Sequence, residues 1–210
     1  MFLLLTSVLL IGLTACGNKE PEYSLEFIEG KTVTIEDNEY VGAFFNFTNN
    51  GDATTYCPND NEMKIGFETS KLVNLQSKGI IYLLESKIRS DNSSTALLGF
   101  DNYSLEHLMP KKWRNNWGAC ATEDDAKKRD SLLLTLGNLA IIPQALNASI
   151  RDAAWNVKKA GKGQNKPGLL LCASGLYTLH DALQKNDWNE HEIENRAEWL
   201  LANAQNIWKI

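Results

Sequence analysis

The sequence predicts an α+β fold that is mainly helical, with a short β-hairpin near its N-terminus. Two segments rich in β-branched and aromatic residues, 31–35 and 41–48, predict the strands of this hairpin. Beyond residue 59, apolar residues recur at helical spacing through much of the chain, and one extended segment precedes Pro110. We therefore expect a mainly helical domain that contains a small sheet.

Residues 1–16 have the pattern of a lipoprotein signal. An apolar run over residues 2–13 is followed by Thr-Ala-Cys16, and residues 13–16 resemble the lipobox of bacterial lipoproteins. The run is too short to span a bilayer, so a processed signal is favoured over a transmembrane helix. This predicts a lipid on Cys16 and an extracytoplasmic protein anchored to the membrane. No Lys or Arg precedes the run, which leaves a cytoplasmic location as the alternative.

Residues 17–50 form the next expected unit, a tether followed by the β-hairpin. The segment 18–24 is polar and contains a proline, as a tether behind an anchor would be, and the acidic segment 36–39 separates the two strands. A complete β-sandwich would need several more strands, whereas the sequence turns helical. We therefore place the main domain at residues 51–210.

The elements expected in the main domain share strong apolar periodicity or clear end signals. In order, they are a helix capped by Asn59 or Asp60 and running through Leu72, a helix over 80–88 after a break at Gly79, a short strand over 105–109 ending at Pro110, a polar loop, an apolar segment over 132–142, a helix over 145–159, a Gly/Lys loop over 162–167, and closing helices over 169–183 and 190–208.

Charge is unevenly distributed along the chain. The formal net charge is -5 and the sequence pI about 5.3, which by itself argues against a nucleic-acid-binding protein. Residues 107–169, however, hold eleven Lys and Arg against five Asp and Glu, and the rest of the chain holds ten against 21. A basic middle segment can attract a polyanion locally because phosphate attraction is short-ranged at physiological salt. A solvated basic face without a ligand is the alternative.

The chain has three histidines, and one of them stands beside an acid. His180 and His191 lie in helical, charge-flanked settings and are expected at the surface, whereas His107 follows Glu106 on an extended segment. Phosphodiester hydrolysis needs a base that activates water and a cation that stabilises negative charge. Neighbouring side chains on a strand point to opposite faces, so this pair can share one site only where the strand ends. Pro110 supplies such an ending.

Several ordered motifs resemble the C-terminal nuclease domain of the GmrS/GmrD-type modification-dependent restriction endonucleases. The motifs are CPND at 57–60, SLEHLMPKKW at 104–113, TLGNLAII at 135–142, ALN at 145–147, WNVK at 155–158, and a closing set of Trp188, Ile193, Arg196, Leu200 and Ile207-Trp208. The likeness covers about residues 51–210. This chain departs from the family at Lys111, Ala140 and Asp152, where the family has Gln, Thr and often Asn; none is a catalytic position of the pattern.

The resemblance implies a ββα-metal core of the HNH, or His-Me finger, kind. His107 would be the general base that takes a proton from water, a role suited to an imidazole with an ordinary pKa of ~6.5. Glu106 and Asn147 would bind a divalent cation. Two oxygen ligands that leave water and phosphate to complete the shell suit Mg²⁺ or Mn²⁺ better than Zn²⁺.

Three further residues receive roles from the same resemblance. Asn138 would hold the loop that presents His107, Lys158 is a candidate phosphate contact, and Arg151 is a weaker one. Each role has a simpler alternative. Asn147 stands where a helix N-cap could stand, Asn138 could be an ordinary turn residue, and both basic residues could be solvated helix positions.

These observations predict a metal-dependent DNA endonuclease without a readable target sequence. One alternative is a catalytically inactive surface lipoprotein, or binding module, that retains a nuclease-like fold behind the Cys16 anchor. Another is a small secreted nuclease, which would reconcile the signal with the catalytic set. The restriction enzymes also carry an N-terminal nucleotide-hydrolysing domain that resembles ParB, so a separate recognition or NTPase chain is a possible partner besides DNA.

Overall fold

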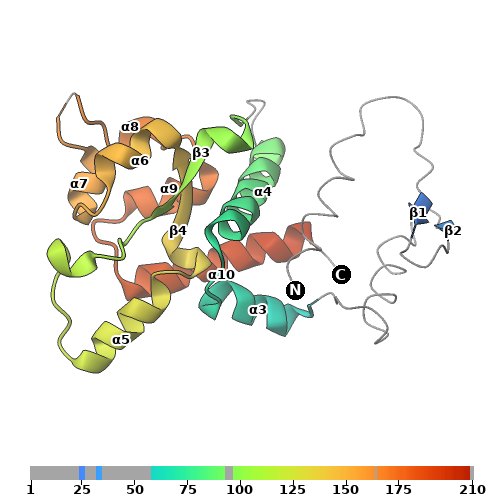
Figure 1. The fold of residues 1–210 in the computed structure, drawn as a ribbon, viewed down its shortest axis with the longest axis horizontal. Coiled ribbons are helices and arrows are strands. Elements are labelled where there is room, and N and C mark those ends of the chain that lie inside the picture. The colour runs from blue at the N-terminus through green and yellow to red at the C-terminus, as the bar shows by residue number, and fades with distance from the viewer. Residues whose placement is uncertain (1–23, 27–31, 35–57, 93–96, 164, 209–210) are drawn as a thin grey trace. The chain divides into compact units, whose positions relative to one another are not determined.

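The computed structural model describes residues 24–26, 32–34, 58–92, 97–163 and 165–208 (Figure 1). The chain divides into two compact units, residues 1–59 with Ile210 and residues 60–209. The signal segment and Cys16 lie outside the described residues, so lipidation stays a prediction. Within the described part of the chain, no helix is both long enough and apolar enough to cross a membrane.

The first unit contains a two-stranded antiparallel sheet. Strand β1 (Ser24–Glu26) pairs with β2 (Thr32–Thr34), and Leu25 lies opposite Val33. The strand expected at 31–35 is therefore present, but the partner described for it is β1, at the edge of the expected tether. Alternation of polar and apolar residues in Ser-Leu-Glu suits a strand, and a short connection favours antiparallel pairing. The other predicted strand, 41–48, lies outside the described residues.

The second unit begins with two helices, α3 (Asp60–Thr69) and α4 (Asn74–Asn92). The helix expected behind a cap at Asn59 or Asp60 is present and starts at Asp60, but it ends at Thr69, before the expected Leu72. The expected break at Gly79 is wrong, because this glycine lies inside α4. A helical glycine costs only about 1 kcal/mol relative to alanine. Burial of Ile81 and Leu84 against the rest of the unit offsets that cost.

A second antiparallel pair forms the centre of this unit. It consists of β3 (Tyr103–His107) and β4 (Leu139–Pro143). The expected strand at 105–109 is thus present, but it starts and ends two residues earlier. Four consecutive residues of β4 are buried, as expected for a strand covered on both faces. Helices α4 and α6 (Gln144–Ile150) both pack against β3 and β4, and Figure 1 shows them to opposite sides of the pair.

Helix α5 (Glu123–Leu132) lies in the segment expected to be a polar loop. Its residues have little hydrophobic periodicity, which is why the apolar pattern did not reveal it. The start signal was present, because Thr122 and Asp125 form a capping box in which each side chain accepts from the other residue's backbone N–H. Three acidic residues in the first turn add favourable interactions with the helix dipole.

The helix expected over 145–159 is two helices, α6 and α7 (Trp155–Ala160). The chain turns between them, and Arg151 there has a positive φ of 34°. The turn redirects the chain so that Trp155 is buried against Trp188, with ring centroids 5.3 Å apart. Apolar periodicity continues across the turn, so sequence spacing alone predicted one helix.

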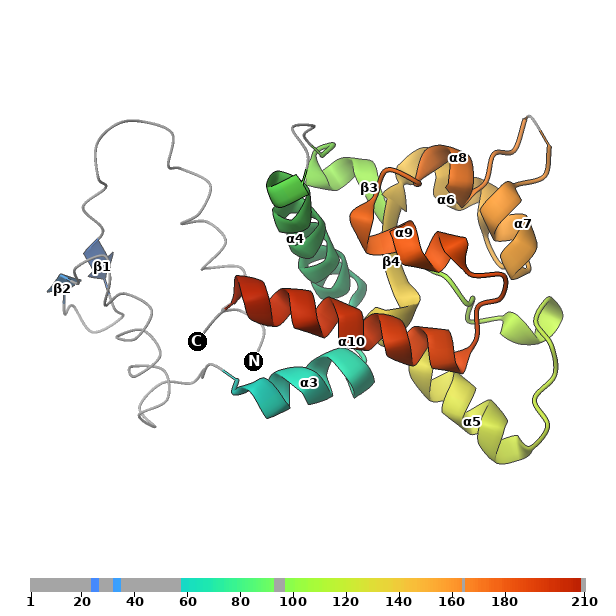
Figure 2. The ribbon, with the colours of Figure 1, turned by 180° about the vertical axis from the view of Figure 1, so that it is seen from behind.

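The closing helices are α8 (Leu169–Cys172), α9 (Tyr177–Gln184) and α10 (Glu190–Ile207). The helix expected over 169–183 is therefore divided, and the one expected over 190–208 is confirmed. In Figure 2, α10 runs across the middle of the unit, between α4 and α9 above it and α3 and α5 below it, and it contacts all four. A helix-rich unit built around one small antiparallel sheet agrees with the predicted α+β class.

Candidate active site

Glu106 and His107 are the last two residues of β3. Glu106 pairs with Ala140 and His107 with Leu139 on β4. The ladder extends one step further, where the backbone N–H of Leu108 donates to the carbonyl oxygen of Asn138 at 2.9 Å, and the chain then leaves the sheet. Glu106 is buried and His107 is half-buried. The strand therefore ends directly after the predicted pair.

Asn138 fixes the segment that follows His107. It is fully buried at the end of the 3-10 helix η3 (Leu136–Asn138). Its Oδ1 accepts from the backbone N–H of Met109 at 2.8 Å, and its Nδ2 donates to the carbonyl of the same residue at 2.8 Å. Nδ2 also donates to the Leu133 carbonyl at 3.0 Å. These bonds to Met109 and Leu133 go beyond what an ordinary turn residue, the simpler alternative, would make.

The indole of Trp188 contacts the same carboxamide. Its Nε1–H donates to Oδ1 of Asn138 at 3.1 Å, and the ring is 1% exposed. Trp155 at the start of α7 packs against this indole. The Asn138 carboxamide therefore binds both the chain after His107 and the indole of Trp188.

Arg196 on α10 holds η3 in place, a role that sequence reasoning did not assign. Its Nη1 donates to the carbonyls of Leu136, Gly137 and Leu139 at 3.2, 2.8 and 2.8 Å. It is 7% exposed, and burial lowers its pKa to about 10, so it stays charged at neutral pH. A lone arginine on the apolar face of a predicted helix was the available signal.

Gly137 allows η3 to approach α10 closely. A Cβ atom at this position would lie 2.2 Å from the backbone oxygen of Ile193, closer than any real contact. Only glycine fits without moving one of the two elements. The Leu-Gly-Asn sequence of η3 thus combines a close approach at the glycine with the buried carboxamide of Asn138.

Lys158 joins the two residues of the predicted pair. Its ammonium group donates to Oε1 of Glu106 and, at 2.7 Å, to the backbone oxygen of His107. The lysine is 0% exposed, so the alternative of a solvated helix position is wrong. Burial lowers the pKa of Lys158 and raises the pKa of Glu106, while the attraction between the two charges opposes both shifts.

The imidazole of His107 is held neutral at physiological pH. Burial, together with the positive charges of Lys111 and Lys158, lowers its pKa to about 4. Its Nε2 is buried and has no hydrogen-bond partner among the described residues. A neutral imidazole with an unpaired ring nitrogen can accept a proton or a hydrogen bond from a ligand.

Asn147 lies at the fourth position of α6, so the alternative of a helix N-cap is wrong. Its side chain lies outside the described residues, and its metal-binding role stays a prediction. Arg151 is exposed just after the same helix. Within the described part of the chain, no group of three or more His, Cys, Asp and Glu side chains could hold a metal ion.

A metal ion would thus depend on a sparse donor set. Three observations are consistent with a metal ion here. They are the buried carboxylate of Glu106, the unpaired Nε2 of the adjacent His107, and the packing of α6, which carries Asn147, against β3. A carboxylate and a carboxamide are the oxygen donors that Mg²⁺ and Mn²⁺ prefer.

The other two histidines are exposed, as predicted. His180 lies 3.2 Å from a carboxylate oxygen of Asp181, and Nε2 of His191 lies 3.1 Å from the Asn195 side chain. Cys120 is a half-buried free thiol, and Cys172 is an exposed one.

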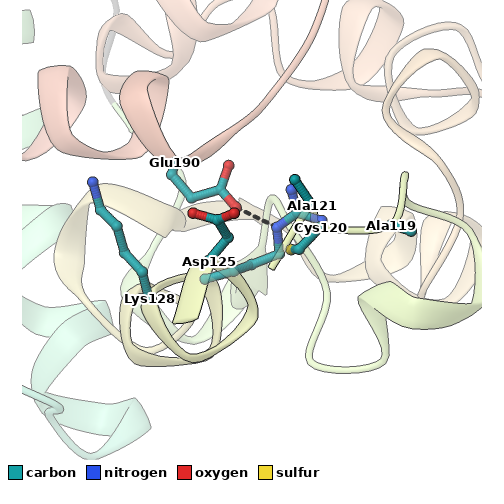
Figure 3. A pocket seen from close by; sticks show the side chains of 7 residues that line it. Ala119, Cys120, Ala121, Asp125, Lys128 and Glu190 are labelled. Carbon is teal, nitrogen blue, oxygen red and sulfur yellow. Dashed lines mark hydrogen bonds and ion pairs between the residues drawn. The ribbon is translucent and has the colours of Figure 1, made fainter. Parts of the chain in front are cut away.

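A separate pocket of about 320 Å³ lies between α5 and the start of α10 (Figure 3). Its lining residues are Ala119, Cys120, Ala121, Asp125, Lys128, Arg129 and Glu190. Arg129 and Glu190, which both line it, form an ion pair that joins the two helices. None of the predicted site residues lines this pocket, so it does not bear on the chemistry at His107.

Comparison with known proteins gives one result that covers most of the chain. Residues 57–203 match the family described as the C-terminal domain of GmrSD restriction endonucleases. The match includes β3, β4 and α6, with Glu106, His107 and Lys158. The comparison with curated proteins gave no match. The chain therefore belongs to the family of C-terminal nuclease domains of GmrSD restriction endonucleases.

Proposed function

We propose that this domain is a metal-dependent DNA endonuclease of the HNH, or His-Me finger, kind in which His107 is the general base. The observation that carries the proposal is the state of His107, a neutral imidazole whose buried Nε2 has no partner among the described residues. A base must be unprotonated before it can take a proton, and the lowered pKa of His107 keeps it so at neutral pH.

The surroundings of His107 support the proposed role by fixing its position. Asn138 holds the backbone two residues later, and Lys158 binds the His107 carbonyl oxygen. Both contacts restrain the backbone, and neither uses the imidazole ring nitrogen. An attacking water bound at Nε2 would transfer its proton there as its oxygen approaches the phosphorus.

A divalent cation, Mg²⁺ or Mn²⁺, is the cofactor we propose. Glu106 and Asn147 would hold it, and β3, β4 and α6 would form the ββα-metal core of the site. When bound, such an ion stabilises negative charge on the phosphate and on the leaving oxygen. The order of these elements and the contacts of α6 with both strands support this arrangement.

DNA is the substrate suggested by the family to which the domain belongs. The local charge around the site supports it. Lys111 is exposed and acts electrostatically on His107, and exposed Lys112 follows it. Positive charge at the mouth of a nuclease site attracts the phosphate backbone. Arg151, exposed beyond α6, remains a proposed phosphate contact.

A plasmid-cleavage assay in Mg²⁺ or Mn²⁺ tests the proposal. We expect the wild type to convert supercoiled plasmid to nicked and linear forms, and His107→Ala to lose this activity while keeping its circular-dichroism spectrum. His180→Ala is the matched control, because that histidine is exposed. Cutting by His107→Ala at the wild-type rate would show that the base is elsewhere. Cutting that is unaffected by EDTA would contradict the metal requirement.

A further inference from the structure

The carboxylate that we propose as a metal ligand already has a cation beside it. Lys158 donates to Oε1 of Glu106 across 52 residues of sequence, and the same ammonium group bonds to the His107 carbonyl. Glu106 is 5% exposed and Lys158 is 0% exposed. An isolated buried carboxylate is strongly disfavoured, so this lysine stabilises the charge of Glu106 when no metal ion is bound.

The position of Lys158 also bears on its predicted contact with phosphate. A DNA backbone approaches from solvent, whereas this side chain is fully buried and two of its bonds go to Glu106 and His107. In this position the ammonium group is a partner of the protein and not of a substrate. It could meet a phosphate only after leaving Glu106.

We propose that Lys158 is a resident counter-ion of Glu106 that a divalent cation must displace. The inference rests on the proposed function, because it takes Glu106 as a metal ligand. Two cations cannot share one small carboxylate site without strong repulsion at short distance. Binding of Mg²⁺ or Mn²⁺ therefore includes the loss of a buried, charge-assisted hydrogen bond, which weakens the apparent affinity for the metal ion.

Substitutions at Lys158 show whether this lysine competes with the metal ion for Glu106 or instead supports metal binding. Lys158→Met removes the competing charge. Lys158→Gln also removes it but keeps N–H donors for Glu106 and the His107 carbonyl, so it is the variant better suited to folding. Lys159→Met is the matched control on the same helix, because the Lys159 ammonium group binds the Lys185 carbonyl at 2.5 Å. Glu106→Gln removes the proposed ligand itself.

The experiment is calorimetric titration of each metal-free full chain with MnCl₂ in the absence of DNA. We expect both Lys158 variants to bind Mn²⁺ at least about tenfold more tightly than the wild type, which corresponds to about 1.4 kcal/mol. Lys159→Met should bind as the wild type does, and Glu106→Gln should bind more weakly. The rise in melting temperature on adding Mn²⁺ should likewise be larger for the Lys158 variants than for the wild type.

The outcomes separate the inference from the proposed function. Unchanged or weaker Mn²⁺ binding by both Lys158 variants, with weaker binding by Glu106→Gln, would overturn the counter-ion role and leave the metal site standing. Wild-type binding by Glu106→Gln, or no binding by any of the proteins, would overturn both. If Lys158→Met does not fold without metal, the titration and melting of Lys158→Gln decide the matter.

Discussion

Replacing Asn138 with alanine removes a carboxamide that makes four hydrogen bonds in the interior of the domain. The partners are the backbone N–H and carbonyl of Met109, the Leu133 carbonyl and the Trp188 indole N–H. Alanine can replace none of these bonds. The protein therefore keeps four polar groups that lose their partner at a site with no exposed surface.

The magnitude follows from the number of bonds. A buried hydrogen bond contributes about 1 kcal/mol net, and a buried group left unsatisfied costs about 1 to 3 kcal/mol. Four bonds, with some relaxation of the Met109 segment, give a loss of about 3 to 5 kcal/mol in the free energy of unfolding. Domains of this kind are stable by about 5 to 15 kcal/mol, so the variant keeps only part of its stability.

Urea unfolding followed by circular dichroism measures this loss, with Asn156→Ala as the control. Asn156 is exposed, and its side chain accepts a hydrogen bond from the backbone N–H of the neighbouring Val157. Asn138→Asp gives a second test, because it keeps the shape but places a carboxylate where Nδ2 now donates to two carbonyls. A loss below about 1 kcal/mol for Asn138→Ala, the range of surface substitutions, would refute the reasoning.

Two further predictions concern the same region. Gly137→Ala should destabilise the domain by about 2 to 4 kcal/mol in urea unfolding, because its Cβ would lie 2.2 Å from the Ile193 oxygen. Gly118→Ala is the control and should have little effect, because there is open space around Gly118. Equal stability of the two variants would contradict the close approach at Gly137. The pKa of His107 falls from 6.5 to about 4 on folding, so between these values the unfolded state binds a proton that the folded state does not. The free energy of unfolding of the metal-free protein should therefore fall as pH drops from 6.5 towards 4, and less so in His107→Ala; identical pH dependence in both proteins would exclude a buried neutral imidazole.

Elements with strong local signals could be predicted from the sequence. The start of α3 at Asp60, the strand before Pro110 and the long closing helix α10 follow from capping, a proline and apolar periodicity. Errors arose where tertiary packing outweighs a local preference. Gly79 remains helical because its neighbours in α4 are buried, and the helix expected over 145–159 divides because the turn near Arg151 places Trp155 against Trp188.

The candidate site shows the same division between local and long-range information. Glu106, His107 and Asn138 lie in sequence motifs, and the resemblance of these motifs to a known family predicts their roles. Contacts between distant segments have no local signal. The pairing of Lys158 with Glu106 depends on where α7 lies relative to β3. The burial of Arg196 over the carbonyls of η3 likewise depends on how α10 packs. Apolar periodicity predicts which face of α10 is buried, but it does not predict which segment that face contacts.

We propose that Glu106 and Asn147 bind one divalent cation beside the general base His107. Crystals of inactive His107→Ala soaked in MnCl₂ would show the ion directly in an anomalous difference map recorded at the manganese edge. We expect one strong peak in contact with the carboxylate of Glu106 and the carboxamide of Asn147, with the Lys158 ammonium group moved away from Glu106. A manganese peak elsewhere on the chain, or an Asn147 side chain directed away from Glu106 with no peak between them, would contradict the account.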